Sequence, residues 1–481
     1  MKIKKLSLCL FLCSLFLSGS VCFADEFLTT LLAGYFRNNL SLQKLATDVE
    51  LELLSAKSTN ISNGFNIQLS SGTVTFKSGS DSLLTFTPNA TLTFSQFNNL
   101  SFTASSEIDI TSESKTVSDT SLSLSLDIYS GSSAKRKVAL LESERSVLEA
   151  QRALQNGFLS AEKEFYTSLK SLFNTAVSIV QAEEELYEDK ISFEEIKAQG
   201  YSTGSTKYRS AQMEVLSDER TVENSRRELE REAKIFASKC GIEYNFSDAQ
   251  DFLPKEIPLV DAIDVLDFSK DDYTEIESAR WTKFINTLSR EAEKAFTLTG
   301  NLGYTFDNED TDTDTVDAGA AFTLFDSALT LNAGVSLPVA TNVTSPVYTF
   351  GFSVDPSSFF QYSITQNQNK LYEEQEEIAL KSAQNDYDTD VITQQSSLED
   401  ILWSKQTNTD SYEMYSQLEE DTAEYFARGI ITESEWLSAK VNKENYRIQC
   451  LINDIELIIY NNETELLFCR DSELKIENLE E

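Results

Sequence analysis

Residues 121–150 read SLSLSLDIYSGSSAKRKVALLESERSVLEA and contain the change of pattern on which the fold depends. Every second residue from Leu122 to Ile128 is apolar, and the residues between them are polar. This alternation puts all the apolar side chains on one face of a β-strand. From residue 134 to residue 198 the chain then has no Pro, a single Gly and apolar residues at helical spacing. The stretch therefore predicts a strand followed at once by a long helix.

The alternation with a period of two fills two blocks of the chain, at about residues 64–130 and 296–354. Each block contains about four such runs. Between two runs of the second block, the acidic stretch from Asp307 to Asp317 predicts a solvated loop at a hairpin tip. Strands with one apolar face and one polar face occur in outer-membrane β-barrels and also in soluble β-sandwiches, so the strands alone leave both open.

Two long helices are predicted after each strand block. The helix at residues 134–198 would be about 100 Å long at a rise of 1.5 Å per residue, which is too long for a globular domain. Such a helix must pack along others in a coiled coil or a helical barrel. A turn at Gly200–Thr206 leads to a helix that ends near Cys240, and the second half repeats this order. There the helices cover about 359–428 and the residues up to about 468, with a turn at 429–432.

A constant offset between matching residues points to an internal duplication. Gly429 follows Gly200, Thr432 follows Thr203, and Cys469 follows Cys240 by 229 residues in each case. This offset is close to half of the chain, as a tandem repeat would leave it. We therefore predict two structural repeats, at residues 25–262 and 263–481.

The first residues predict export. Three Lys residues at positions 2, 4 and 5 precede an uncharged run from Leu6 to Leu17, and small residues lead to a cut after Ala24. These features are typical of a secretory signal peptide at residues 1–24. A lipoprotein signal that ends at Cys22 stays open as an alternative. No later stretch is predicted to be a transmembrane helix, so membrane insertion would require a barrel.

The composition disfavours several classes of function. The 481 residues include no His and carry a formal net charge of -38. Imidazole-based catalysis and most zinc sites are therefore excluded, and a nucleic-acid partner is disfavoured because phosphate binding needs a basic surface. We predict no enzyme activity, no cofactor and no metal. A secreted carboxylate-based glycosidase stays open, although no pair of acids stands out.

Three stretches together resemble the TolC-type outer-membrane efflux proteins. The first is Ser121–Gly131 running into Ala134–Val138, which is similar to the family's last strand and the start of its long helix. The second is the turn in each half. The third is Phe426–Ala439, in which Thr432 follows Gly429 by three residues and Ala439 follows it by ten. The first half departs from this pattern, because Ala211 lies eleven residues after Gly200. The strands depart too, since the family usually has two strands in each half and this chain has about four runs, so either the barrel is larger or some runs form extra hairpins beside it.

The resemblance implies an α+β fold in which strands from two tandem repeats contribute to an outer-membrane β-barrel. Long coiled-coil helices would form a periplasmic α-helical barrel. It implies a homotrimer in outer-membrane lipid that serves as the exit duct of a tripartite efflux or type I secretion system. The partners would be a periplasmic adaptor and an inner-membrane pump, and small molecules or proteins would pass through without energy input. The alternative is a periplasmic or surface coiled-coil structural protein or adhesin.

The resemblance also selects residues of the helix turns. Gly200, Thr203, Gly429 and Thr432 would form the tips of the helix pairs. Related channels place acids six and nine residues after the second turn Gly, where this chain has Glu435 and Ser438. With Glu433, Glu435 would form a ring of carboxylates at a narrow mouth. Both acids equally suit the first turn of a helix, and both Thr residues suit an N-cap.

Overall fold

The computed structural model describes residues 26–469, apart from 78–82, 112, 308–313, 326 and 340–344. The predicted signal peptide, including Cys22, lies outside the described residues. The chain forms two compact units. The helical unit comprises residues 1–46, 152–274 and 386–470, and the sheet unit comprises 47–151, 275–385 and 471–481. None of the helices in the described ranges is long and apolar enough to span a membrane.

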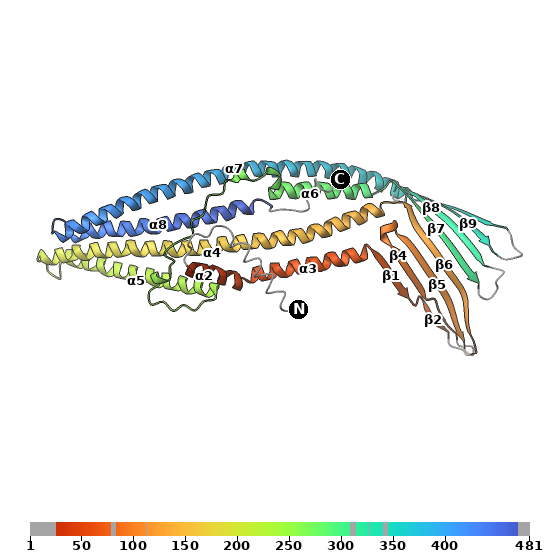
Figure 1. Ribbon diagram of the computed structural model, residues 1–481, viewed down its shortest axis with the longest axis horizontal. Coiled ribbons are helices and arrows are strands. Elements are labelled where there is room, and N and C mark those ends of the chain that lie inside the picture. The colour runs from red at the N-terminus through yellow and green to blue at the C-terminus, as the bar shows by residue number, and fades with distance from the viewer. Residues whose placement is uncertain are drawn as a thin grey trace. The chain divides into compact units, whose positions relative to one another are not determined.

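The sheet unit contains one antiparallel sheet, in which neighbouring strands follow the order β1-β4-β5-β6-β7-β8-β9-β10 (Figure 1). The pairing of β6 with β7 joins the two halves of the chain. The strands are β1 (Phe65–Ser70), β2 (Val74–Lys77), β3 (Leu83–Phe86), β4 (Asn89–Phe94), β5 (Leu100–Thr111), β6 (Lys115–Tyr129), β7 (Phe296–Asp307), β8 (Thr315–Leu324), β9 (Leu329–Pro338) and β10 (Val347–Val354).

The sheet is eight strands wide, because the short strands β2 and β3 extend β1 and β4 rather than widen it. Strand β3 continues the position of β4 along β5: Leu92 of β4 lies opposite Phe102, and Phe86 of β3 lies opposite Ile108. Strand β2 pairs with β3 in the same way that β1 pairs with β4. The four runs expected in the first half correspond to β1, β4, β5 and β6. Strands of four residues are too short for a period of two to be recognised.

Helix α6 (Thr274–Ala292) precedes β7 and was not expected from the sequence. Its Trp281 and Ile285 pack against Val138 and Leu141 near the start of α4 (Ser132–Ala198). Helix α7 (Pro356–Ala427) follows β10, and α3 (Leu40–Ser62) precedes β1. The predicted strand blocks are thus flanked by more helix than the pattern indicated.

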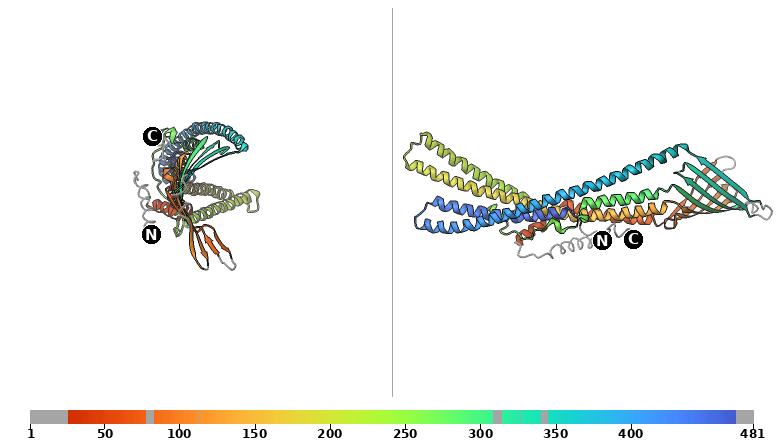
Figure 2. Two further views of the ribbon diagram at one scale, coloured as in Figure 1. Left: turned by 90° about the vertical axis from the view of Figure 1, so that its right-hand side faces the viewer. Right: turned by 90° about the horizontal axis from the view of Figure 1, so that it is seen from above.

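The helical unit is built on two antiparallel helix pairs, which Figure 2 shows closing in tight turns. The first joins α4 to α5 (Thr206–Cys240), and the second joins α7 to α8 (Glu433–Leu466). Helix α2 (Glu26–Asn38) adds Leu28, Leu31 and Tyr35 to the same core. The link from α5 to α6 has only 3-10 turns: η2 (Gln250–Phe252), η3 (Val265–Asp267) and η4 (Lys270–Asp272); η1 (Ser95–Phe97) lies in the sheet unit.

Contacts between side chains fix the order of the four long helices in the helical unit. Thr175 of α4 donates a hydrogen bond to Glu232 of α5 over 3.1 Å. On the other side of α4, Lys170 forms an ion pair of 2.6 Å with Glu456 of α8. Helix α8 in turn contacts α7, where Lys405 lies 2.8 Å from Asp454. The order is therefore α5, α4, α8 and α7, which leaves α5 and α7 at the two flanks.

Candidate functional site: the turns between the long helices

The turn after α7 ends the helix with a left-handed Gly. Gly429 has a φ of +70°, and the amide of Ile430 donates to the carbonyl of Tyr425 over 2.9 Å. The amide of Gly429 donates to the carbonyl of Phe426 over 2.8 Å. This pair of bonds is a Schellman cap, which satisfies the last carbonyls of the helix. The backbone at Gly429 therefore favours a residue without a Cβ atom.

The turn after α4 uses the same backbone conformation at Gly200, where φ is +77°. The amide of Gly200 donates to the carbonyl of Lys197 over 3.0 Å. Ser205 rather than Thr203 is the N-cap of α5, because its hydroxyl accepts from the amide of Tyr208. The prediction that Thr203 is the N-cap is thus wrong by two residues. The N-cap follows the left-handed Gly by five residues in this turn but by three residues in the turn between α7 and α8.

The turn before α8 holds Glu435 in a reciprocal cap. The Thr432 hydroxyl accepts from the amide of Glu435, and the Glu435 carboxylate accepts from the amide of Thr432 over 2.9 Å. It also accepts from the Thr432 hydroxyl over 3.0 Å. This capping box satisfies two backbone donors that the helix itself leaves free. These bonds to Thr432, from its amide first, lower the pKa of Glu435.

Glu433 lies in a different environment, although only one residue separates it from Glu435. The hydroxyl of Tyr187, on α4, donates a hydrogen bond to the Glu433 carboxylate. Burial and this bond raise the pKa of Tyr187. The contact joins the start of α8 to the side of α4, so Glu433 connects the two helix pairs. Nothing in the local sequence around Tyr187 indicates this role, because the two residues are far apart in the chain.

Aromatic and acidic side chains hold the second turn together from inside the α7–α8 pair. Phe426 stacks on Trp436 with ring centroids 5.4 Å apart and an interplanar angle of 4°. Trp436 Nε1 donates to Glu419 over 3.3 Å, and Lys443 also lies 3.4 Å from that carboxylate. The turn is thus a rigid end of two packed helices. Trp436 lies within the stretch Phe426–Ala439 that carries the resemblance, and its place three residues after the start of α8 puts it opposite α7.

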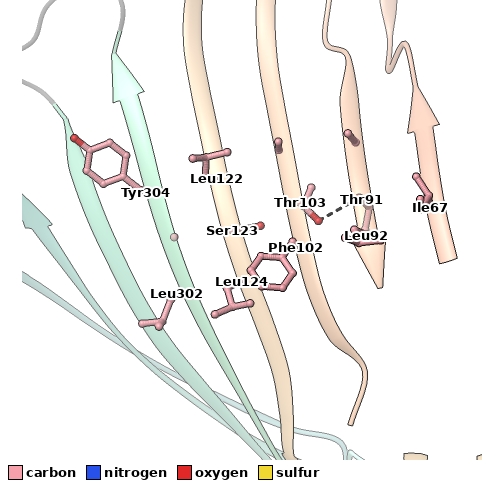
Figure 3. Close-up of a pocket in the computed structure, with 13 residues that line it drawn as sticks. Ile67, Thr91, Leu92, Phe102, Thr103, Leu122, Ser123, Leu124, Leu302 and Tyr304 are labelled. Atoms are coloured by element: carbon pink, nitrogen blue, oxygen red, sulfur yellow. Dashed lines mark hydrogen bonds between the residues drawn. The ribbon is translucent and has the colours of Figure 1, made fainter. Parts of the chain in front are cut away.

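Besides the helix turns, the sheet is a candidate functional surface, because its two faces differ in polarity. One row across all eight strand positions is apolar, and Figure 3 shows five of its members. The row consists of Ile67, Leu92, Phe102, Leu124, Leu302, Ala318, Val335 and Tyr348. The next row, on the opposite face, is mostly polar and consists of Gln68, Thr91, Thr103, Ser123, Gly303, Asp317, Ser336 and, on β10, the apolar Val347.

The apolar face is exposed in a single copy of the chain. On β10, the exposed fraction is 82% for Phe350 and 79% for Phe352. The polar face is linked by hydroxyl contacts between strands, such as the 3.1 Å contact of Thr91 with Thr103. An exposed apolar surface of this extent needs a non-aqueous neighbour, because soluble surfaces carry only small apolar patches.

Two family models match the chain in tandem. The TP096X N-terminal domain matches residues 31–257, and the TP096X C-terminal domain matches residues 258–471. No curated protein matches the chain.

The chain is also similar to solved structures. It matches the outer-membrane channel OprN with a TM-score of 0.50 and 12% sequence identity, over 92% of this chain and 91% of that one. The Campylobacter jejuni CmeC outer membrane channel matches with a TM-score of 0.47 and 13% sequence identity, over 96% of this chain and 92% of that one. The outer membrane protein VceC from Vibrio cholerae matches with a TM-score of 0.45 and 14% sequence identity, over 91% of this chain and 94% of that one. The chain thus shares the fold of the outer-membrane channel OprN, and its residues 31–471 belong to the TP096X N-terminal and C-terminal domain families.

Proposed function

We propose that the protein is an outer-membrane channel that serves as the passive exit duct of a tripartite efflux or secretion system. The observation that carries the proposal is the sheet with one apolar and one polar face, on a chain that also has two long helix pairs. Strands of this kind suit a barrel wall with lipid on one side and water on the other. The fold of OprN, an outer-membrane channel, supports the same interpretation.

The sheet has the dimensions that a membrane wall needs. Strands β5 to β9 contain 10 to 15 residues each. A tilted strand needs about 9–11 residues to cross the hydrocarbon layer. The exposed Phe350 and Phe352 would face lipid, where burial of aromatic and aliphatic surface is favourable. The row with Thr103, Ser123 and Asp317 would then face the pore.

The sheet is open at β1 and β10, and an open edge is not stable in lipid because its amides and carbonyls have no partners there. We therefore propose that three copies close one barrel, each edge β10 pairing with β1 of the next copy. Three sheets of this width would give a barrel of about 24 strands and roughly 50 Å in diameter. This is wider than the resemblance to the family suggests, which would give two strands for each half of the chain.

The helix turns would form the periplasmic end of the duct and meet an adaptor and an inner-membrane pump. In a trimer, three copies of Glu433 and Glu435 would surround the mouth and favour cations over anions. The capping bonds of Glu435 lower its pKa and so keep its carboxylate charged at neutral pH. A coiled-coil adhesin would also explain the helices, but it would have no use for the two-faced sheet.

Planar-bilayer recording of the purified protein tests the proposal. We expect a stable conductance that prefers cations, together with heat-modifiable migration of the membrane fraction on gels. The double variant Glu433→Gln, Glu435→Gln should keep the conductance but lose part of the cation preference, because Gln preserves the capping bond without the charge. Absence of conductance and of heat modification would favour the adhesin. Unchanged selectivity in the double variant would remove the carboxylate ring from the proposal.

A further inference from the structure

Helices α5 and α7, at the two flanks of the helical unit, carry opposite charges at the same spacing. We propose that α5 of one copy packs antiparallel against α7 of the next copy, with a row of arginines on α5 facing a row of acids on α7. The inference rests on the proposed ring of identical copies and identifies the surfaces that close it.

The row on α7 repeats every eleven residues. Acids occupy positions 388, 399, 410 and 421, and each is followed four residues later by an apolar residue. These are Ile392, Trp403, Met414 and Tyr425. They are exposed, with 72% of Trp403 and 57% of Met414 accessible. Asp388 already forms an ion pair of 2.9 Å with Lys270 of the same copy, so the part of the row open to a neighbour is 399–421. Eleven residues make three helical turns, so the acids and the apolar residues form two adjacent stripes along a nearly straight helix.

The row on α5 has the same spacing. Arg209, Arg220 and Arg231 are separated by eleven residues and are all exposed. Within the described ranges, Arg209 and Arg220 form no ion pair, and Arg231 pairs only with Glu228 in its own helix. Exposed apolar residues, Met213 and Leu216, lie beside the row. Helix α5 therefore presents charges and apolar surface that complement those of α7.

Both rows point away from the helices that α5 and α7 already contact. Val222 and Leu229 of α5 are buried, and Arg220 lies about 160° and 180° around the helix from them. Glu232, which contacts α4, lies about 120° around the helix from Arg220. On α7, Asn408 and Tyr415 contact α8, and Met414 lies about 100° or more around the helix from both. The rows thus form the outer edges of the four-helix layer, where the next copies of a ring would lie.

Contacts within one copy show that the two rows also lie at matching heights. Glu232, next to Arg231 on α5, accepts a hydrogen bond from Thr175 of α4. Lys170 lies five residues before Thr175 on α4 and forms an ion pair with Glu456 of α8. Because α8 runs opposite to α4, the level of Thr175 lies about five residues before Glu456 on α8, close to Asn453. The Asn453 side chain accepts a hydrogen bond from Asn408 of α7 over 3.2 Å. Arg231 and Asp410 are therefore level within about one helical turn.

Rotation about an axis parallel to the helices keeps these heights in every copy. Because α5 and α7 run in opposite directions, the match repeats after eleven residues, and Arg220 becomes level with Asp421. The apolar residues match in the same way, since Leu216 becomes level with Tyr425. The neighbour that fits α7 is therefore a second copy of this chain, which offers charge and apolar surface in the same register.

Charge reversal with rescue tests the pairing. The variants Arg220→Glu and Arg231→Glu should each lower the trimer fraction in detergent by about tenfold, because every reversal acts at three interfaces. Combining Arg220→Glu with Asp421→Arg, or Arg231→Glu with Asp410→Arg, should restore the trimer. Arg209→Glu is the matched control, because α7 has ended at its level, and it should leave the trimer intact. Failure of both rescues would overturn the pairing.

A disulfide test fixes the register. The double variant Leu216→Cys, Tyr425→Cys should give crosslinked dimers and trimers under oxidising conditions. The pair Leu216→Cys, Trp403→Cys, about 33 Å apart along the helices, should not crosslink. A trimer that crosslinks in neither pair would refute the α5–α7 contact but leave the channel intact as a proposal. A wild-type protein that is monomeric in the membrane would refute both.

Discussion

At the scale of single residues, Glu433 and Glu435 lie close together in the sequence but their carboxylates have different hydrogen-bond partners. The carboxylate of Glu435 is bound to the amide and hydroxyl of Thr432, and that of Glu433 accepts from Tyr187 on another helix. In the sequence the two acids were equivalent members of one ring. The capping function of Glu435 follows from a local pattern, whereas the contact of Glu433 depends on how α8 lies beside α4.

The cap of α8 should depend on pH. Bonds from Thr432 lower the pKa of Glu435, so its stabilising effect is complete above the ordinary pKa of a Glu and is lost as the pH falls through the lowered value. Glu435→Ala should therefore lower the thermal midpoint at pH 7, and the difference from wild type should shrink at about pH 3. Glu435→Gln keeps the acceptor and serves as the control. An effect of Glu435→Ala that is equal at both pH values would contradict a charged cap.

The buried Arg145 should be a site of high sensitivity in the sheet unit. Only 5% of Arg145 is exposed, its guanidinium bonds to Glu277 and Glu149, and it lies 5.1 Å from the centre of the Trp281 ring. Glu277→Ala leaves this charge with only the more exposed Glu149, so we expect a loss of about 3 kcal/mol in the free energy of unfolding. Denaturant unfolding in detergent measures it. Glu149→Ala, which removes the exposed partner, should cost much less.

At the scale of elements, the long repeated patterns were recognised, whereas a shorter helix and the pairing of distant strands were not. The helix expected at residues 134–198 is α4 at Ser132–Ala198, and the runs around Leu124 and Leu302 are β6 and β7. Long repetition makes such patterns unambiguous. Helix α6 was missed although Trp281, Phe284, Ile285 and Leu288 follow the i, i+3, i+4, i+7 spacing of an amphipathic helix. Only its packing against the distant start of α4 had no signal in the sequence. The pairing of β6 with β7 likewise joins segments that no local signal connects.

The turns between the helix pairs should tolerate no side chain at the left-handed Gly. A Cβ atom at Gly429 would meet no other atom within 4 Å, so the cost of Gly429→Val comes from its φ of +70° alone. We expect a loss of at least about 1–2 kcal/mol and impaired assembly. Gly204→Val, in the first turn but without a positive φ, is the control. Equal thermal midpoints and trimer yields for both variants would show that the turn can relax.

At the scale of the whole molecule, two sets of surfaces are left unsatisfied in one copy. The sheet has open edges at β1 and β10 and an exposed apolar face, and α5 and α7 carry exposed rows of opposite charge. Each feature requires a neighbour, and the requirements are of different kinds. Lipid can cover an apolar face, but only another strand can satisfy an edge. Assembly and membrane insertion are therefore expected to depend on each other.

The two ends of the molecule should lie on opposite sides of the outer membrane. Because the first residues predict export, the hairpin between β7 and β8 should project outside the cell, and the helix turns should lie in the periplasm. Its tip falls in the predicted acidic loop from Asp307 to Asp317, most of which lies outside the described residues. An epitope at Asp312 should be labelled on intact cells, since a charged loop of this kind has no reason to be buried. The matched control is an epitope at Gly204 in the α4–α5 turn, which should be labelled only after the outer membrane is opened. The reverse pattern would invert the topology, and labelling of both sites on intact cells would favour a surface adhesin over a channel.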